Sequence, residues 1–405
     1  MSALVERFLR YIQIPTQSAH DSQTVPSTER QFNLAKVLGE ELKELGFVDV
    51  QVTDHAYVLG RLKGNCPTAP TIGFCSHIDT ALDVTDENMR PRIVKNYDGG
   101  VIPLDEAGTV NLDPETFPSL KDHIGDDLIV TDGTTLLGAD DKAGIAEIIT
   151  ACEELKNSTR PHGDVVVCFC PDEEIGHGAS LLDIKAWGAD VAYTLDAMGT
   201  GVFNYETFNA AWAKVEFIGR SVHPGSAKNS MINAVLLATE FINQLPPAEA
   251  PAHTEEYEGF YHVCDLNVSV ESGVLNLILR DHDDAKLNAK KDFIALLVRQ
   301  MNERYGKEVV KVTMGDSYKN MRDVVMQKPE IVEKALQAIR NVGLEPIVEP
   351  VRGGTDGSQL SARGLPTPNI FYGGYNAHGK YEYASVQSME KAVATVVELV
   401  HLWAC

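Results

Sequence analysis

The sequence has little positive charge for its length. Its 405 residues include 35 lysines and arginines against 58 aspartates and glutamates, which gives a formal net charge of −23 at pH 7. A surface of this sign repels phosphate groups, so the composition argues against nucleic acids and anionic membrane surfaces as partners. Most of the acidic excess is expected to serve solubility alone.

Long apolar runs are also missing. No segment has the roughly 20 consecutive apolar residues that a helix needs to cross a bilayer. The stretch from Met1 to Ile12 alternates apolar and charged residues as an amphipathic helix does, and it lacks the uninterrupted apolar core of a signal peptide. We therefore expect no membrane partner.

Cysteines form no pattern that would suggest disulfides. There are seven, an odd number, and they are scattered through apolar segments such as the one that holds Cys168 and Cys170. They are predicted to be core thiols rather than a disulfide framework or a zinc knuckle. A reducing cytoplasm is the compartment that fits them.

The order of periodic segments predicts one domain inserted into another, and we find no internal repeat. Helical and strand-like segments alternate up to about Asp196, which predicts an α/β fold with a mixed, mostly parallel sheet flanked by helices. From Gly201 the pattern becomes that of a smaller α+β layer. The predicted first domain comprises residues 1–203 and 320–405, and the predicted insertion comprises residues 204–319. Within the insertion we expect strands at 212–218 and 308–314, two strands within 262–280, and helices at 231–242 and 283–305.

Imidazoles and carboxylates follow several of the strand-like runs. The apolar run 71–76 leads into His77 and Asp79, whose side chains point the same way because strands alternate with period two. A metal-bound imidazole is commonly oriented by such a carboxylate. Farther along, Asp140 and Asp141 stand where a strand-like stretch turns into a helix. Asp141 is interpreted as favourable negative charge at a helix N-terminus, and for Asp140 that reading and a metal ligand remain open.

The run 164–170 is almost wholly apolar and leads directly into acids. Glu173 and Glu174 follow it, in a segment flanked by glycines. Ligands of open α/β sheets gather beyond the carboxyl ends of the strands, so this position favours a site over a solvated surface. Adjacent glutamates suit a division of labour between a metal ligand and a general base. Two further strand-like runs lead to Asp196 and, through a glycine loop, to His378.

These motifs resemble those of the co-catalytic zinc exopeptidases, a family that also includes aminoacylases, desuccinylases and glutamate carboxypeptidases. The resemblance extends over nearly the whole chain and is nearest to the tripeptide aminopeptidases of that family. The segment 253–262 discriminates best, since the metal motifs are common to all relatives. Tyr375 stands where a histidine is expected, a departure that concerns local substrate contacts. The motifs that carry the resemblance are Ser76–Thr80, Leu137–Gly144, Pro171–Gly178, His253–His262 and Arg352–Ser358.

The resemblance implies a role for each position. His77 and Asp196 would hold one zinc ion, Glu174 and His378 a second, and Asp140 would bridge the two. Asp79 would orient His77, and Glu173 would act as the general base. Zinc accepts imidazole nitrogen and carboxylate oxygen, so the chemistry of the residues agrees with this allocation. The resemblance also makes the insertion 204–319 a lid on the catalytic domain.

Three residues are candidates for substrate contacts. His223 resembles the family's lid histidine, which would polarise the scissile carbonyl. Arg280 and Arg352 are both candidates for pairing with a peptide's terminal carboxylate, because guanidinium offers a bidentate fork. Arg280 is preferred because the family's lid sheet would turn it toward the cleft, although either could be a plain surface arginine.

The leading hypothesis is an aminopeptidase that removes the N-terminal residue from tripeptides, with short peptides as its partners. A deacylase or carboxypeptidase acting on N-acyl amino acids with the same metals is the alternative, and segment 253–262 argues against it. A metal-binding protein without catalysis is a third hypothesis, against which the unligated Glu173 argues. The sequence leaves oligomeric state open, with a homodimer as one outcome, and cobalt or manganese would fit the same donors as zinc.

Overall fold

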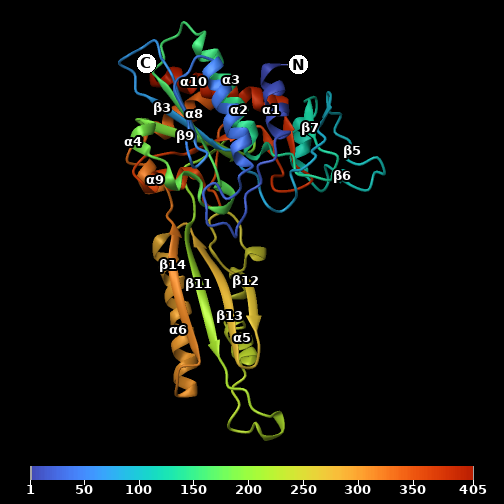
Figure 1. Ribbon diagram of the computed structural model, residues 1–405, viewed down its shortest axis with the longest axis vertical. Helices are drawn as coiled ribbons and strands as arrows, with labels where there is room; N and C mark the ends of the chain where they lie inside the picture. Colours follow the sequence, from blue (N-terminus) through green and yellow to red (C-terminus); the bar gives the residue numbers. More distant parts are fainter. Residues whose placement is uncertain (1, 405) are drawn as a thin grey trace. The chain divides into compact units, whose positions relative to one another are not determined.

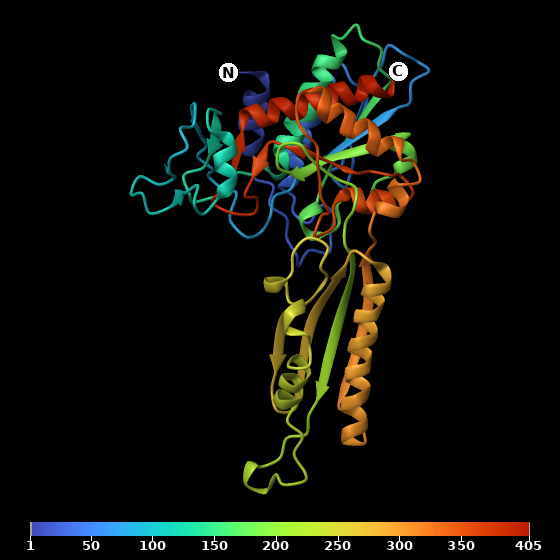
Figure 2. The same ribbon diagram turned by 180° about the vertical axis from the view of Figure 1, so that it is seen from behind.

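The protein divides into two compact units (Figures 1 and 2). The computed structural model describes residues 2–404. The first unit comprises Met1–Tyr205, Met321–Glu349 and Thr355–Cys405, and the second comprises Glu206–Asn320 and Pro350–Gly354.

The unit boundaries shift from the predicted ones by one or two residues at 204–205 and Asn320, and residues 350–354 lie in a different unit from the domain predicted for them. Residues 350–354 fall within the predicted first domain, yet they pack in the second unit. The reason is backbone pairing with the start of that unit. The N–H of Val351 donates to Glu206, and the N–H of Phe208 donates to Gly353.

An eight-stranded mixed sheet forms the centre of the first unit. Its four middle strands, β8, β3, β9 and β16, run parallel, whereas β2 and β10 pair antiparallel to β8 and β16. The predicted α/β class with a mostly parallel sheet is thereby confirmed. In their order across the sheet, the strands are β1 (Val48–Val52), β2 (Val58–Leu62), β8 (Val165–Cys170), β3 (Ile72–His77), β9 (Val191–Met198), β16 (Asn369–Tyr372), β10 (Val202–Asn204) and β15 (Ile347–Val348).

Both faces of this sheet are covered, which explains why its strands are apolar throughout. In β8, Val167 and Phe169 pack into the largest core, whereas Cys168 and Cys170 pack on the opposite face. Alternation along the strand therefore supplies two cores at once. The helices of this unit are α1 (Ala3–Ile12), α2 (Gln31–Glu44), α3 (Ala139–Lys156), α4 (Ile184–Trp187), α7 (Arg322–Val325), α8 (Glu330–Asn341), α9 (Asp356–Ala362) and α10 (Val386–Trp403).

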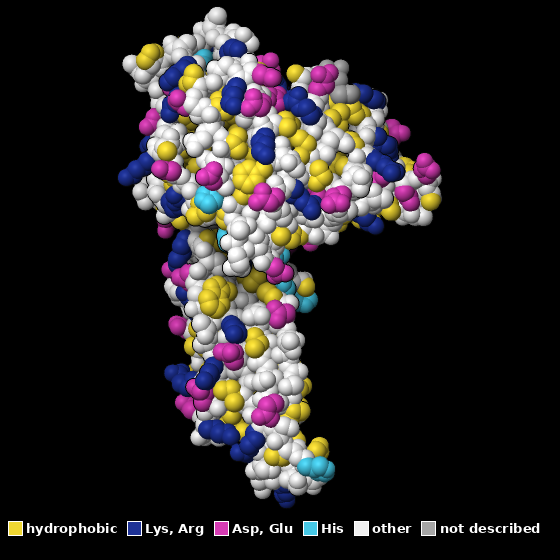
Figure 3. Space-filling model, in the orientation of Figure 1, with side chains coloured by type: hydrophobic (Ala, Val, Ile, Leu, Met, Phe, Trp, Pro, Cys, Tyr) yellow, Lys and Arg dark blue, Asp and Glu magenta, His cyan; other side chains and the backbone are white. Residues whose placement is uncertain are grey.

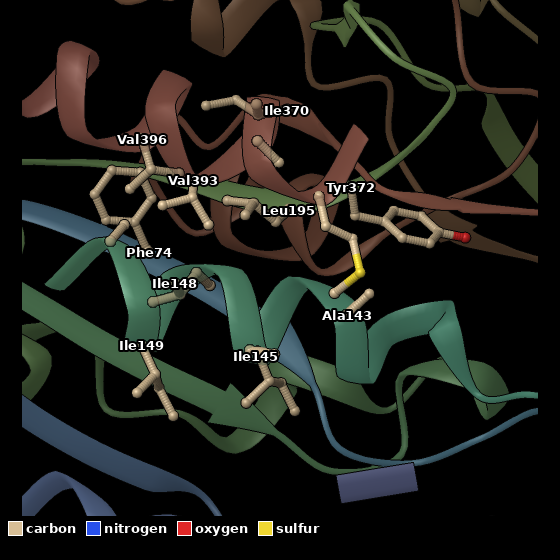
Figure 4. Close-up of a cluster of buried hydrophobic side chains, with 14 of the residues drawn as sticks. Phe74, Ala143, Ile145, Ile148, Ile149, Leu195, Ile370, Tyr372, Val393 and Val396 are labelled. Atoms are coloured by element: carbon tan, nitrogen blue, oxygen red, sulfur yellow. The ribbon is translucent and has the colours of Figure 1, made fainter. Parts of the chain in front are cut away.

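Helix α3 packs between the central strands and α10, and it is buried along most of its length. Figure 4 shows Ile148 of this helix among Phe74 and Leu195 from the strands and Val393 and Val396 from α10. Each fully buried side chain of this size contributes about 1.5–3 kcal/mol. This core fixes α3, and with it the turn at the N-terminal end of α3.

Two small sheets complete the first unit. β17, β18, β7 and β4 form one, and β5 and β6 form the other. They enclose a separate core that includes Tyr375 and Tyr383, whose rings are stacked. The strands are β17 (Gly374–Tyr375), β18 (Tyr383–Ser385), β7 (Leu128–Val130), β4 (Arg92–Val94), β5 (Ile102–Pro103) and β6 (Asn111–Leu112).

The second unit is a four-stranded antiparallel sheet packed against two helices. Leu275, Leu277 and Leu279 of β13 share a core with helical residues, and the residues between them, with Arg280, lie on the other face. The strand and helix types predicted for the insertion are confirmed. In order across the sheet the elements are β12 (Phe260–Val268), β13 (Ser272–Asp281), β11 (Asn209–Ile218) and β14 (Val310–Tyr318), with helices α5 (Ala234–Ile242) and α6 (Asp284–Tyr305).

The cysteines of the described residues are all free thiols. Cys75, Cys152, Cys168 and Cys170 are buried, as expected of core thiols, whereas Cys66 is half-buried and Cys264 is exposed. Acidic and basic side chains are interspersed on the face drawn in Figure 3. Among residues 2–404, no helix combines the length and the apolar character that crossing a bilayer requires.

Candidate metal centre

His77 is the last residue of β3, and Asp79 follows it. Both side chains are buried. Nδ1 of His77 lies 3.0 Å from the backbone oxygen of Asp79 and 3.4 Å from its carboxylate. The carboxylate of Asp79 accepts the backbone N–H groups of Glu173 and Glu174, at 3.0 and 3.2 Å. Asp79 was predicted to orient His77, and the structure adds that its carboxylate holds the acidic loop after β8.

Asp140 lies in the turn that leads into α3. Gly138 begins this turn with a φ of 71°, a left-handed conformation that glycine adopts without strain. The backbone of Asp140 is not helical, although it stands at the start of the helix. Its Oδ1 lies 2.9 Å from Nε2 of His77, and its Oδ2 lies 3.3 Å from Nε2 of His378. Asp140 thus lies between two histidines that are far apart in the sequence.

The acidic loop after β8 is fixed at its first residue. Asp172 has a φ of 56°, and its buried carboxylate accepts hydrogen bonds from the backbone N–H of Ser27, at 2.6 Å, and from Nε2 of Gln31, at 2.6 Å. Glu173 and Glu174 then open a short 3₁₀ helix, η2 (Glu173–Ile175). The sharp turn explains how an extended, apolar strand can deliver two consecutive acids to one place.

Asp196 is aimed by an irregularity in β9. The ladder between β9 and β16 shifts register, so that Ile370 pairs with Leu195 while Phe371 pairs with Ala197. Asp196 is the residue passed over, and such a bulge redirects one side chain. His378 lies in the loop after β17 with a φ of 65°, and its Nε2 is 3.0 Å from Oε2 of Glu174.

These five side chains form two groups that share one member. Within each group, the ligand atoms all lie within 4.8 Å of one another. The groups are His77, Asp140 and Asp196, and Asp140, Glu174 and His378. The first unit therefore brings together all five residues predicted as metal ligands.

Comparison with known proteins gives this geometry a context. The model of peptidase family M20/M25/M40 matches residues 135–402. Peptidase T of Clostridium botulinum (strain Hall) is 50% identical over 406 residues, which covers 100% of both chains. The chain belongs to peptidase family M20/M25/M40. The predicted resemblance to the tripeptide aminopeptidase branch of that family, which is peptidase T, is confirmed.

Other relatives of this M20/M25/M40 protein agree. Peptidase T of Clostridium perfringens is 48% identical, again over 100% of both chains. The crystal structure of aminopeptidase PepT from Bacillus cereus superposes with a TM-score of 0.79 at 23% identity, covering 100% of this chain and 98% of that one. A Bacillus subtilis protein described as a dinuclear metal-binding peptidase of the M20 family has a TM-score of 0.67 at 13% identity, covering 99% of this chain and 97% of that one. The last two likenesses concern the fold.

The electrostatics of the centre favour a cation. Hydrogen bonds to Asp140 and Glu174 raise the pKa of His378 to about 11. Burial raises the pKa of Asp140, but hydrogen bonds with His378 and His77 lower it further, so that it lies below its usual value. Burial, together with the charge of Asp140, raises the pKa of Asp196 well above its usual value. The buried carboxylates therefore lie so close together that a cation bound among them would be stabilised.

The donor set fits divalent transition-metal ions. Imidazole nitrogen and carboxylate oxygen are both zinc ligands. Glu174 also indicates a cation site, because its Oε1 is buried and has no hydrogen-bond partner among the described residues. A buried carboxylate oxygen without a partner is costly unless a cation or a donor meets it.

Glu173 stands beside these groups without being a member of either. Burial raises the pKa of its carboxyl well above the usual value, and the charge of Asp196 adds to the effect. A carboxylate of raised pKa takes up a proton more readily at neutral pH. The environment of Glu173 is the one that a general base needs.

The three candidate substrate residues lie in the second unit. His223 is exposed, and its Nδ1 accepts the N–H of Gly225 at 3.1 Å. Arg280 is half-buried, with its guanidinium carbon 4.8 Å from the ring centroid of Tyr318. Nη1 of Arg280 is buried and has no hydrogen-bond partner among the described residues.

Arg352, by contrast, uses its fork within its own unit. Nη1 donates to the carbonyl oxygens of Glu256 and Glu258, each at 2.8 Å, and Nη2 donates to Oγ1 of Thr254 at 2.8 Å. The guanidinium also lies over the rings of Phe208 and Phe260. Arg352 therefore anchors residues 254–258, which lie within the segment 253–262 that carried part of the predicted resemblance.

Sequence reasoning missed several residues around the centre. Asp141, interpreted as helix-terminal charge, is buried and accepts the backbone N–H of His77 at 3.2 Å. Glu382 accepts three backbone N–H groups next to Asp140. Tyr375 is buried and bonds Thr200 and Ser388 with its hydroxyl. Asp141 was signalled by its adjacency to Asp140 and Tyr375 by its departure from an expected histidine, whereas Glu382 had no signal in the sequence.

Proposed function

We propose that this chain is an aminopeptidase that removes the N-terminal residue from tripeptides with the help of two zinc ions. The observation that carries the proposal is the sharing of Asp140 by two potential ligand groups, in a chain that is 50% identical over its whole length to a peptidase T. The four buried free thiols support a reducing compartment, and we place the protein in the cytoplasm.

In this proposal each group holds one ion. His77 and Asp196 would hold the first, Glu174 and His378 would hold the second, and Asp140 belongs to both groups. Its two oxygens already face different histidines, at 2.9 and 3.3 Å. Two zinc ions bound there would supply an acidified water and would polarise the carbonyl of the scissile bond.

Glu173 is the proposed general base. Its carboxylate is left free by the ligand groups, and its raised pKa suits it to accept a proton from water and to return that proton to the departing amine. Asp79 is the proposed positioning residue, because it contacts His77 and also holds the backbone of Glu173.

Arg280 is the proposed partner of the substrate's terminal carboxylate. Its buried Nη1 has no hydrogen-bond partner among residues 2–404, whereas Arg352 has three. A buried guanidinium nitrogen without a partner favours an anion beside it. His223, exposed at a turn, is proposed to contact the scissile carbonyl, and Arg352 to shape the segment around Tyr257.

A cleavage panel on the zinc-loaded protein tests the proposal. The panel contains a free tripeptide, its N-acetylated form, its C-terminal amide, the matching dipeptide and tetrapeptide, and an N-acyl amino acid. We expect release of the N-terminal residue from the free tripeptide and little turnover of the others. Turnover of only the N-acyl substrates would instead make the protein a deacylase and leave the metal centre in place.

A further inference from the structure

Glu382 is a buried carboxylate that joins two distant parts of the candidate metal centre. Its side chain is 1% exposed. One oxygen, Oε2, accepts the N–H groups of Leu137 and Gly138, both at 2.7 Å, and the other, Oε1, accepts the N–H of Asp140 at 3.0 Å. Three donors on one carboxylate fix the turn that carries Asp140.

The backbone of Glu382 is equally engaged. Its N–H donates to the carbonyl of Gly379 at 3.1 Å, which closes the loop that begins at His378. A second bond, from Nδ2 of Asn376 to the carbonyl of Tyr381 at 3.2 Å, closes the same loop from outside. One residue therefore connects the loop of His378 to the turn of Asp140.

We infer that Glu382 is a positioning residue that sets the geometry of the ion position formed by Asp140, Glu174 and His378. The inference rests on the proposed two-ion centre. Of the two ligand groups, only this one contains His378. Glu382 bonds the backbone of Asp140 directly and, through Gly379, closes the loop that carries His378. In the other group, Glu382 contacts Asp140, whereas His77 and Asp196 belong to the separate strands β3 and β9.

The substitution Glu382→Gln removes an acceptor while keeping the shape. A carboxylate offers two acceptor oxygens, whereas an amide offers one and turns two donors toward the N–H groups that remain. Either the N–H of Asp140 or the N–H groups of Leu137 and Gly138 would then lack an acceptor. Residues that support ligands in this way typically contribute about 10- to 100-fold in metal affinity.

The test is zinc binding by the metal-free full chain. Competition with a chromophoric chelator gives the two affinities, and native mass spectrometry gives the number of ions bound. For Glu382→Gln we expect one of the two affinities, that of the position formed by Asp140, Glu174 and His378, to fall about 10- to 100-fold while the other changes by a few-fold at most. Glu382→Asp, which keeps the charge but withdraws it by one methylene, is expected to act in the same direction.

Glu147→Gln is the matched control. Glu147 is also fully buried, lies on α3 and accepts one backbone N–H, that of Gly373 at 2.9 Å, while its other oxygen has no partner among the described residues. An amide can replace it without losing that bond, so both zinc affinities should stay as in the parent protein. Circular dichroism of each metal-free variant reports whether the fold is kept.

Several outcomes would overturn the inference. Parental affinities in both Glu382 variants would show that the carboxylate does not position the ligands. Equal weakening of both ions, or loss of the fold in both variants, would make Glu382 a determinant of stability rather than of one ion position. A parent that binds fewer than two ions would remove the centre itself, whereas a parent that binds two ions but cleaves no tripeptide would overturn only the proposed function.

Discussion

The carboxylate of Asp79 accepts the backbone N–H of Glu173 at 3.0 Å, so a residue two positions after His77 also positions the proposed base. The same carboxylate accepts the N–H of Glu174. Movement of Asp79 would thus displace a proposed ligand and the proposed base together.

Asp79→Asn should lower kcat/KM for a tripeptide about 10- to 100-fold, in the range seen for residues that support metal ligands. The amide keeps one acceptor but presents donors to the N–H groups of the loop. The exposed Asp54 supplies the control, since Asp54→Asn should leave the rate unchanged. Equal rates for the two variants would contradict the role of Asp79.

Glu173→Gln should reduce kcat about 10²- to 10⁴-fold, the usual contribution of a positioned base, and should leave the zinc content unchanged. The same substitution at the neighbouring Glu174 should have a different effect on zinc content. Glu174→Gln should lose zinc as well as activity, because Glu174 belongs to a ligand group. Measured zinc content separates the two, and loss of zinc from Glu173→Gln would contradict the assignment.

Arg280→Met should raise KM for the free tripeptide about 10- to 100-fold, which corresponds to a charged hydrogen bond worth roughly 1.5–3 kcal/mol. Hydrolysis of the tripeptide amide, which has no terminal carboxylate, should change little. Arg352→Met should act differently, because its donors hold the backbone at Glu256 and Glu258. Faster amide hydrogen exchange confined to segment 254–260 is expected of it, and equal loss for both substrates in Arg280→Met would exclude a carboxylate contact.

Removal of the metals should destabilise the protein as well as inactivate it. A ligand present at 100 times its dissociation constant stabilises the folded state by about 2.7 kcal/mol. Chelation should therefore lower the unfolding temperature, and zinc should restore both temperature and activity. Parallel titrations with cobalt and manganese identify which ion restores activity best, and unchanged stability after complete chelation would contradict the centre.

Acid should weaken the contact between α1 and α2. Burial opposes the charge of Glu41, but hydrogen bonds from Tyr11 and Arg7 outweigh it, so the pKa of Glu41 lies below its usual value. The stabilisation is thus present above about pH 4.3, the usual pKa of a glutamate, and is lost as the pH falls through the lower folded-state pKa. Glu41→Gln should cost about 2 kcal/mol at pH 7 in urea unfolding.

The difference between this variant and the parent should shrink as the pH falls below that value. Glu40→Gln on the same helix is the control, because Glu40 is exposed and, within residues 2–404, forms an ion pair only with the exposed Lys43. A surface pair of this kind contributes less than about 0.5 kcal/mol. A Glu41→Gln penalty that persists unchanged in acid would show that the contact does not depend on charge.

Residues at the ends of apolar strands could be predicted from the sequence. His77, Glu173 and Asp196 each follow or end a run whose burial the structure confirms, and parallel strands bring their carboxyl ends to one edge. His378 needed the family resemblance, because a histidine in a glycine loop has no periodic signal.

The supporting contacts could not be predicted, because they join residues that share no local pattern. Glu382 contacts residues more than 240 positions away, and Asp172 is held by Gln31, 141 positions away. The role of Arg352 was hidden for the same reason. Its partners at Thr254 and Glu256 are determined by the pairing of residues 350–354 with the start of the second unit.

That pairing limits how the protein can be recombined with its relatives. A chimaera that exchanges only residues 206–320 would contain the relative's segment 254–258 together with the native Arg352, which must hydrogen-bond to that segment. The graft would be compatible only if the donor's backbone there presented the same two carbonyl oxygens to the guanidinium. Four splice points rather than two are therefore needed to transplant the second unit intact, and the five residues 350–354 are inherited with it as one module.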